Sequence, residues 1–132
     1  MSDLEVLTRK RLRILVVDDN LDQVRSMAYL LKDLGHEVEY AINGIVAIEL
    51  ARSRKPQVVL LDMRLPDTNG SSVAKELRRS AGLVGTSIIG ISGYPMNRAD
   101  ASAAGFDEML SKPVDLHALI ALLERNHPRP EE

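Results

Sequence analysis

Residues 58–62 read VVLLD, four consecutive apolar residues followed by a carboxylate. A run that is apolar at every position, rather than at alternate ones, is typical of a strand buried on both faces of a parallel sheet. Two further short runs have this character, Ile14 to Val17 and Ile88 to Ile91. These three segments therefore predict the inner strands of a sheet that is covered by helices.

Weaker strand candidates lie at Glu37 to Ile42 and Glu108 to Ser111. Between the strands, apolar residues recur three or four positions apart, as they do on one face of a helix. This periodicity predicts five helices, over residues 24–34, 45–53, 73–77, 98–104 and 116–123. Gly35 and Gly105 are expected to end the first and the fourth of them.

Strict alternation of strand and helix predicts an α/β protein with a parallel sheet, because right-handed crossovers leave few other arrangements. Five such units suit the doubly wound, flavodoxin-like order 2-1-3-4-5. We expect a three-layer (βα)5 domain over residues 12–125. Residues 1–11 are expected to form a flexible lead and residues 126–132, which contain two prolines, a frayed tail.

The amino-acid composition makes some classes of function improbable. The chain has 132 residues, 45% of them apolar and 27% charged, as expected for one globular domain, and no cysteine for a disulfide or a thiolate metal site. The absence of cysteine and of an apolar leader favours a cytoplasmic location. Seventeen basic against nineteen acidic residues lack the excess that nucleic-acid binding usually requires, and no stretch predicts membrane insertion. The basic cluster Arg9 to Arg11 is interpreted as a solvated lead.

Polar residues follow four of the predicted strands. Asp18 and Asp19 follow the first, Asp62 the third, Ser92 the fourth and Lys112 the fifth. Each has an ordinary explanation alone, such as a helix cap or a turn. Ligands of open parallel sheets bind at the carboxyl ends of the strands, however, and in the predicted order these four strands are neighbours. The pattern therefore predicts a site at this edge.

Three neighbouring carboxylates repel one another unless a cation joins them. Mg²⁺ prefers oxygen ligands and is typically held by one or two carboxylates together with a phosphate oxygen. A lysine and a serine hydroxyl suit further phosphoryl oxygens, and a carboxylate can accept a phosphoryl group as an aspartyl phosphate. The residue types thus predict phosphoryl chemistry with magnesium.

At these positions the chain resembles the receiver domain of two-component response regulators, over about residues 12–125. The resemblance rests on four stretches in order: ILVVDDN (14–20), VVLLDMRLPDTNG (58–70), IIGISGY (88–94) and GFDEMLSKPVDLHAL (105–119). As an ordered set they are highly specific. The resemblance implies a signalling domain that catalyses only its own phosphorylation and dephosphorylation.

The resemblance also assigns roles. Asp62 is expected to accept the phosphoryl group, with Lys112 binding it and Ser92 acting as the switch hydroxyl. Magnesium is expected at Asp18, Asp19, Asp62 and the backbone carbonyl of Arg64. The donor would be a phosphohistidine on a sensor histidine kinase or a histidine phosphotransfer domain, and an unknown protein would receive the signal. The Lys112–Pro113 peptide is expected to be cis.

Some positions depart from the common pattern or carry no signal. Met109 occupies the place where many receivers have an aromatic switch residue, so a rotamer switch there is in doubt. Met109 is expected to pack half-buried, and Tyr94 to line its loop. His36, His117 and His127 share no metal-ligand spacing and are expected to be structural or exposed.

Three alternatives stay open from the residues. A magnesium phosphatase with an aspartyl nucleophile would carry an aspartate as general acid two residues later, where this chain has Arg64. A flavin or nucleotide module would need a Gly- or Ser/Thr-rich loop after the first strand, where residues 18–22 are acidic. A receiver-like domain that only binds a partner, without phosphorylation, is the third. A stand-alone regulator and a part of a larger protein are equally compatible with these motifs.

Overall fold

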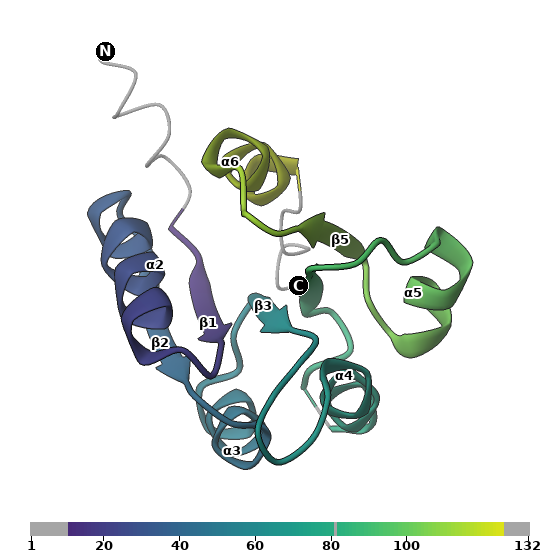
Figure 1. Cartoon of the computed structure of the whole chain (residues 1–132). Coiled ribbons are helices and arrows are strands. Elements are labelled where there is room, and N and C mark those ends of the chain that lie inside the picture. Colours follow the sequence, from purple (N-terminus) through teal and green to yellow (C-terminus); the bar gives the residue numbers. More distant parts are fainter. Residues whose placement is uncertain (1–10, 81, 126–132) are drawn as a thin grey trace.

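The computed structural model describes residues 11–80 and 82–125 and contains a five-stranded sheet with helices on both faces (Figure 1). The strands are β1 (Arg13–Val17), β2 (Glu37–Ala41), β3 (Val58–Asp62), β4 (Ser87–Ser92) and β5 (Glu108–Ser111). Every neighbouring pair is parallel and the order is β2-β1-β3-β4-β5, which confirms the predicted doubly wound fold. The predicted lead and tail lie outside the described residues, apart from Arg11.

The helices are divided between the two faces of the sheet (Figure 1). They are α2 (Leu21–Asp33), α3 (Gly44–Arg54), α4 (Gly70–Arg79), α5 (Arg98–Ala104) and α6 (Leu116–Arg125). Two of them, α2 and α6, cover one face, and α3, α4 and α5 cover the other. Among the described helices, none combines the length and the apolar character needed to cross a bilayer.

The element limits differ from the predicted ones by a few residues at polar ends. β1 begins at Arg13, β3 extends to Asp62, β4 includes Ser87 and Ser92, and β2 ends before Ile42. Polar end residues still pair through their backbones, so the hydrophobic pattern underestimates β1, β3 and β4, whereas it overestimates β2 by the apolar Ile42. The helix ends at Gly35 and Gly105 are confirmed, and both glycines have positive φ angles, 100° and 101°.

The core is built around β3, all five residues of which are buried. Successive side chains of a strand point to opposite faces, so Val58 and Leu60 pack with α2 and α6, whereas Val59 and Leu61 pack with the helices of the other face. Asp62 therefore lies at the end of the most completely buried strand of the sheet.

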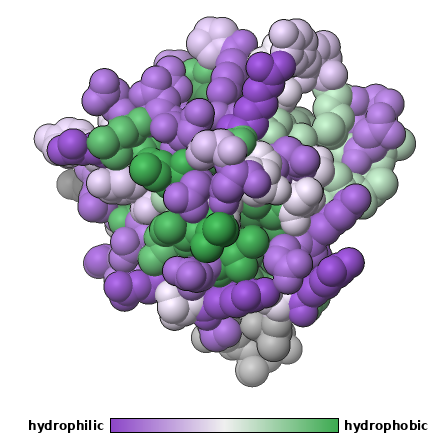
Figure 2. Space-filling model, turned by 60° about the horizontal axis from the view of Figure 1, so that its bottom comes forward, coloured by the Kyte–Doolittle hydropathy of each residue, from purple (hydrophilic) through white to green (hydrophobic). Residues whose placement is uncertain are grey.

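Helix α3 contributes little apolar bulk to this core. Its buried side chains are alanines, Ala47 and Ala51, while Ile45 is 64% exposed and Val46 37% exposed. Figure 2 brings the side of α3 and α4 forward and shows apolar surface among hydrophilic residues there. Ile48 and Leu50 pack half-buried against the same core.

Polar contacts fix the opposite edge of the sheet, where β4 and β5 begin. The Arg78 guanidinium donates to the carbonyl oxygens of Thr86 at 2.7 Å and Gly105 at 3.1 Å and pairs with Asp107 at 2.6 Å. The Asp107 carboxylate also accepts a hydrogen bond from the backbone N–H of Ile88 at 2.7 Å. The planar guanidinium has donors for all these acceptors at once, which a lysine could not reproduce.

His36 gives the fold a pH dependence. The residue is 8% exposed, and its Nδ1 accepts a hydrogen bond from the backbone N–H of Leu12 at 3.1 Å. Burial lowers the pKa of His36 below its ordinary value, and the charge of Glu124 opposes this more weakly. The neutral ring is thus the form that the folded state favours, as predicted for a structural histidine.

We predict that unfolding free energy falls as the pH is lowered below the ordinary histidine pKa of about 6.5. Above that value the contribution of neutral His36 is complete. Below it the unfolded chain gains a proton that the folded chain resists, at a slope of at most about 1.4 kcal/mol per pH unit. Unfolding free energies from urea titrations between about pH 7.5 and 5 should depend less steeply on pH in His36→Gln than in the parent chain.

The exposed His117→Gln is the matched control for this measurement, because it also removes one imidazole. It should retain the slope of the parent chain. Equal slopes in the parent and in His36→Gln would contradict the assignment.

Candidate functional site

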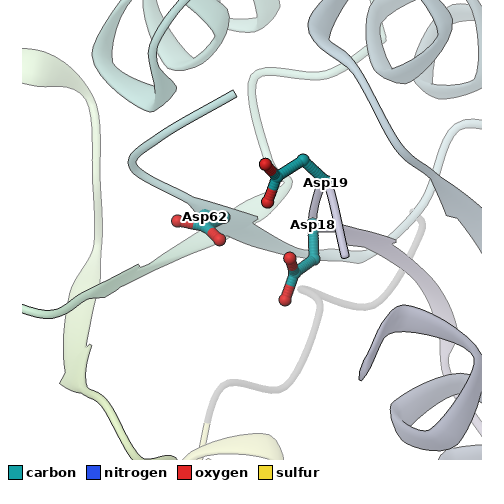
Figure 3. Close-up of side chains that lie close together, drawn as sticks. All are labelled: Asp18, Asp19 and Asp62. Carbon is teal, nitrogen blue, oxygen red and sulfur yellow. The ribbon is translucent and has the colours of Figure 1, made fainter. Parts of the chain in front are cut away.

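Three carboxylates gather where β1 and β3 end. Asp18 and Asp19 follow β1 directly and Asp62 is the last residue of β3, and each offers a carboxylate oxygen within 4.8 Å of the others. Figure 3 shows the three side chains around a common space, with Asp62 approaching from the neighbouring strand. The register of β1 on β3 pairs Val17 with Leu61, so the residues that follow them arrive side by side. The predicted convergence at this edge is present for these three residues.

Asp62 has one partner for each carboxylate oxygen. Its Oδ2 accepts a hydrogen bond from Lys112 Nζ at 2.9 Å, and its Oδ1 accepts one from the backbone N–H of Arg64 at 3.0 Å. The Asp62 side chain is only 4% exposed, whereas that of Lys112 is 40% exposed. Lys112 therefore reaches from the solvent edge, just past β5, to a carboxylate 50 residues away in sequence.

The electrostatics of the cluster follow from burial and crowding. Burial raises the pKa of Asp18, and the neighbouring charges of Asp62 and Asp19 add to the rise, although a hydrogen bond from the Asn20 backbone opposes it. The hydrogen bond to Asp62 raises the pKa of Lys112, so the ammonium form is favoured. Three carboxylates thus face a single lysine in this cluster, which leaves an excess of negative charge.

This donor set fits Mg²⁺. The three side chains offer hard oxygen atoms within reach of one another, and their excess negative charge is of the kind a divalent cation relieves. Lys112 occupies only one oxygen of Asp62, and a carboxylate has further lone pairs for a second partner. Asp18, Asp19 and Asp62 could hold the ion, with the Arg64 backbone next to them in the loop.

Ser92 lies at the end of β4, but its hydroxyl is engaged locally. Ser92 Oγ donates to the backbone carbonyl of Tyr94 at 2.7 Å and accepts from the backbone N–H of Tyr94 at 3.1 Å. This is the ordinary loop role that the sequence also allowed. The Tyr94 ring is exposed and lies under the Arg64 guanidinium, 5.4 Å from ring centre to Cζ. The loops after β3 and β4 are therefore in contact.

Met109 packs on the sheet beside Gly90, its partner in the register of β4 and β5. The half-buried thioether lies directly over Gly90, so a β-carbon at position 90 would come within 2.5 Å of the Met109 sulfur and 3.0 Å of the Phe106 ring. The glycine thus makes the space that Met109 fills. The predicted half-buried packing of Met109 is confirmed, as is the cis Lys112–Pro113 peptide.

One residue near the site has a role that the sequence did not indicate. Asp67 lies in the loop after β3, and its carboxylate accepts hydrogen bonds from two backbone N–H groups at the start of α3. An aspartate after a proline is common in turns, so the sequence carried no signal for partners more than 20 residues away.

Comparison with known proteins agrees with this geometry. The response regulator receiver domain family matches residues 14–124. Protein PilH of Pseudomonas aeruginosa is 32% identical, over 82% of this chain and 91% of PilH. Response regulator MprA of a Mycobacterium species is 32% identical, over 88% of this chain and 52% of MprA. Hybrid signal transduction histidine kinase G of Dictyostelium discoideum is 30% identical over 97% of this chain. The match spans only 4% of the length of that kinase.

Solved structures of response regulators have the same fold. The chemotaxis response regulator CheY4 of Vibrio cholerae superposes with a TM-score of 0.82 at 25% identity, over 89% of this chain and all of CheY4. The sheet order is that of this CheY-like, flavodoxin-like group. Taken with the family match over most of its length, this shows that the chain belongs to the response regulator receiver domain family, a class of signalling domains rather than of classical enzymes.

Proposed function

We propose that this receiver domain accepts a phosphoryl group on Asp62, from a phosphohistidine of a sensor histidine kinase or histidine phosphotransfer domain, and passes the signal to a downstream protein. The observation that carries the proposal is the environment of Asp62. This buried carboxylate is held by a lysine and faces two more carboxylates at one edge of the sheet. Such an arrangement suits a nucleophile that must attract a phosphoryl group together with a divalent cation.

The transfer forms one bond and breaks one. A carboxylate oxygen of Asp62 attacks the phosphorus, the P–N bond of the phosphohistidine breaks, and the electron pair leaves with the imidazole, which takes up a proton. Lys112, which already donates a hydrogen bond to Asp62, is placed to stabilise negative charge on the phosphoryl oxygens. Bound magnesium would offset further charge during transfer. Asp18 and Asp19 would hold it together with Asp62 and the backbone carbonyl of Arg64.

A groove beside the site offers a surface for the donor protein. It has a volume of about 750 Å³ and lies between α2 and the segment after β5. Its lining is largely apolar and includes Met27, Leu30, Val114 and Leu116, while Asp18 and Lys112 form its end next to Asp62. A donor that places apolar side chains in this groove would bring its phosphohistidine close to Asp62.

The readout would begin at Ser92. A phosphoryl group on Asp62 offers an oxygen that competes with the Tyr94 carbonyl for the Ser92 hydroxyl. Breaking that local hydrogen bond would release the loop that carries Tyr94, which also contacts Arg64. Because Met109 fills the space over Gly90, the rearrangement is expected to be smaller on the face of α5, β5 and α6 than in receivers with an aromatic switch.

The first prediction concerns the acceptor. Asp62→Asn should fold, because the side chain keeps its volume and the half-exposed Lys112 can turn to water. It should take up no phosphoryl group from acetyl phosphate with magnesium, as measured by intact mass and peptide mapping under conditions that preserve acyl phosphates. Asp33→Asn, an exposed carboxamide on α2, should label like the parent chain. A parent chain that binds magnesium but never labels would favour the partner-binding alternative.

The second prediction concerns the acidic pair. Asp19→Asn should weaken Mg²⁺ binding about tenfold or more in calorimetric titration, since it removes one charged ligand. Without magnesium it should be as stable as the parent or more so, because a repulsive charge is gone. Asp22→Asn, in the first turn of α2, is the control for loss of a nearby negative charge. Unchanged magnesium affinity in Asp19→Asn would count against the assignment.

The third prediction concerns the switch. Ser92→Ala should still be phosphorylated on Asp62, but its amide chemical-shift changes over α5, β5 and α6 should be smaller than those of the parent. Ser111→Ala is the matched control, because Ser111 is the register partner of Ser92 on β5. If Ser92→Ala shows the full perturbation of the parent, the hydroxyl does not couple the site to that face.

A further inference from the structure

The loop between β3 and α4 is attached at its tip to a different helix. Asp67 Oδ1 accepts a hydrogen bond from the backbone N–H of Gly44 at 2.8 Å, and Asp67 Oδ2 accepts one from the backbone N–H of Ile45 at 3.0 Å. Both donors belong to the first turn of α3, where backbone N–H groups have no partner inside the helix. A single carboxylate thus bridges two segments more than 20 residues apart.

The start of α3 is shaped to receive this loop. Thr68 packs so closely over Gly44 that a β-carbon at position 44 would collide with the Thr68 methyl group. Asn43 caps the same helix independently, because its side chain accepts from the backbone N–H of Val46 at 2.9 Å. Asp67 is therefore not needed as the ordinary cap of α3. Its two hydrogen bonds serve to hold the loop.

Backbone hydrogen bonds connect the tip of the loop to the acceptor. The backbone N–H of Leu65 donates to the Thr68 carbonyl at 3.2 Å, and that of Gly70 donates to the Met63 carbonyl at 2.9 Å. Closer to the strand, the backbone N–H of Arg64 donates to Asp62 Oδ1 at 3.0 Å. A displacement of the tip would therefore be transmitted to Arg64 and to the acceptor carboxylate.

We propose that Asp67 is a positioning residue of the phosphoryl-acceptor site: by anchoring the loop to the first turn of α3, it sets the place of the Arg64 backbone beside Asp62. The inference rests on the proposed function, because it concerns the same magnesium and phosphoryl site. Asp67 would act on the site indirectly. Among the described residues, its carboxylate is hydrogen-bonded to the start of α3 and not to the acidic cluster or Lys112.

The charge state of Asp67 agrees with this role. The hydrogen bond from Gly44 lowers the pKa of the Asp67 carboxyl, and the one from Ile45 lowers it further. The group is therefore ionised at neutral pH, the state in which both oxygens accept hydrogen bonds and in which it complements the positive end of the α3 dipole.

Three variants test the proposal. Asp67→Ala removes both hydrogen bonds, Asp67→Asn leaves one acceptor oxygen, and Asn43→Ala removes the independent cap of the same helix. Amide hydrogen exchange is measured without magnesium, magnesium affinity by calorimetry, and the rate of labelling by acetyl phosphate at subsaturating magnesium. The Asn43→Ala control removes the cap of α3 but leaves Asp67 and its two backbone donors in the chain, so it separates positioning from helix stability.

We expect Asp67→Ala to bind Mg²⁺ roughly tenfold more weakly than the parent, the low end of the loss that follows removal of supporting residues around metal ligands. Labelling at low magnesium should slow by a similar factor and recover at high magnesium. Exchange should quicken at the Arg64 amide as well as at Gly44 and Ile45. Asp67→Asn should be intermediate, and Asn43→Ala should keep the magnesium affinity and the Arg64 exchange of the parent.

Parent-like magnesium affinity and Arg64 exchange in both Asp67 variants would overturn the proposal, as would an equal loss in Asn43→Ala. Failure of the proposed function looks different, because the parent chain itself would then take no phosphoryl group. In that event the exchange of the Arg64 amide, which needs neither magnesium nor phosphate, still decides whether Asp67 positions the loop.

Discussion

The ion pair between Asp62 and Lys112 is the interaction on which the site depends. Burial of β3 on both faces brings its last residue to a place with little access to water, where an unpaired charge is costly. Lys112 supplies the opposite charge at 2.9 Å from beyond β5, passing the end of β4 on the way. The pair therefore requires three strands to end at the same level, and the sheet register provides this.

The polar groups at the two ends of the strands differ in how fully they are paired. At the amino end of β4 and β5, Arg78 and Asp107 satisfy backbone groups and join loops into a fixed arrangement. At the carboxyl end, three carboxylates face one lysine, and the Ser92 hydroxyl is bonded only to its own loop. Excess charge and local hydrogen bonds that can be exchanged are unfavourable for a rigid scaffold, but they would suit the proposed response to a phosphoryl group on Asp62.

The sequence was informative where chemistry and periodicity coincide. Continuous apolar runs identified β1, β3 and β4, and strand-helix alternation was enough to predict the order of the sheet. The polar strand ends identified the acidic cluster and Lys112. Contacts between distant residues away from the strand ends could not be predicted, because each partner looks ordinary by itself. Asp67 resembles any turn aspartate, and Arg78 resembles any helix-terminal arginine, until their partners on other elements are known.

The packing of Met109 over Gly90 has a consequence for how this domain can change in evolution. A β-carbon at position 90 would require the end of the flexible Met109 side chain to move, with the Phe106 ring also close by, and a flat ring at position 109 would lie beside bare backbone. The two positions are register partners on β4 and β5, so substitutions at them are expected to be coupled rather than additive. Evolutionary change at one of them is therefore expected to depend on the residue at the other.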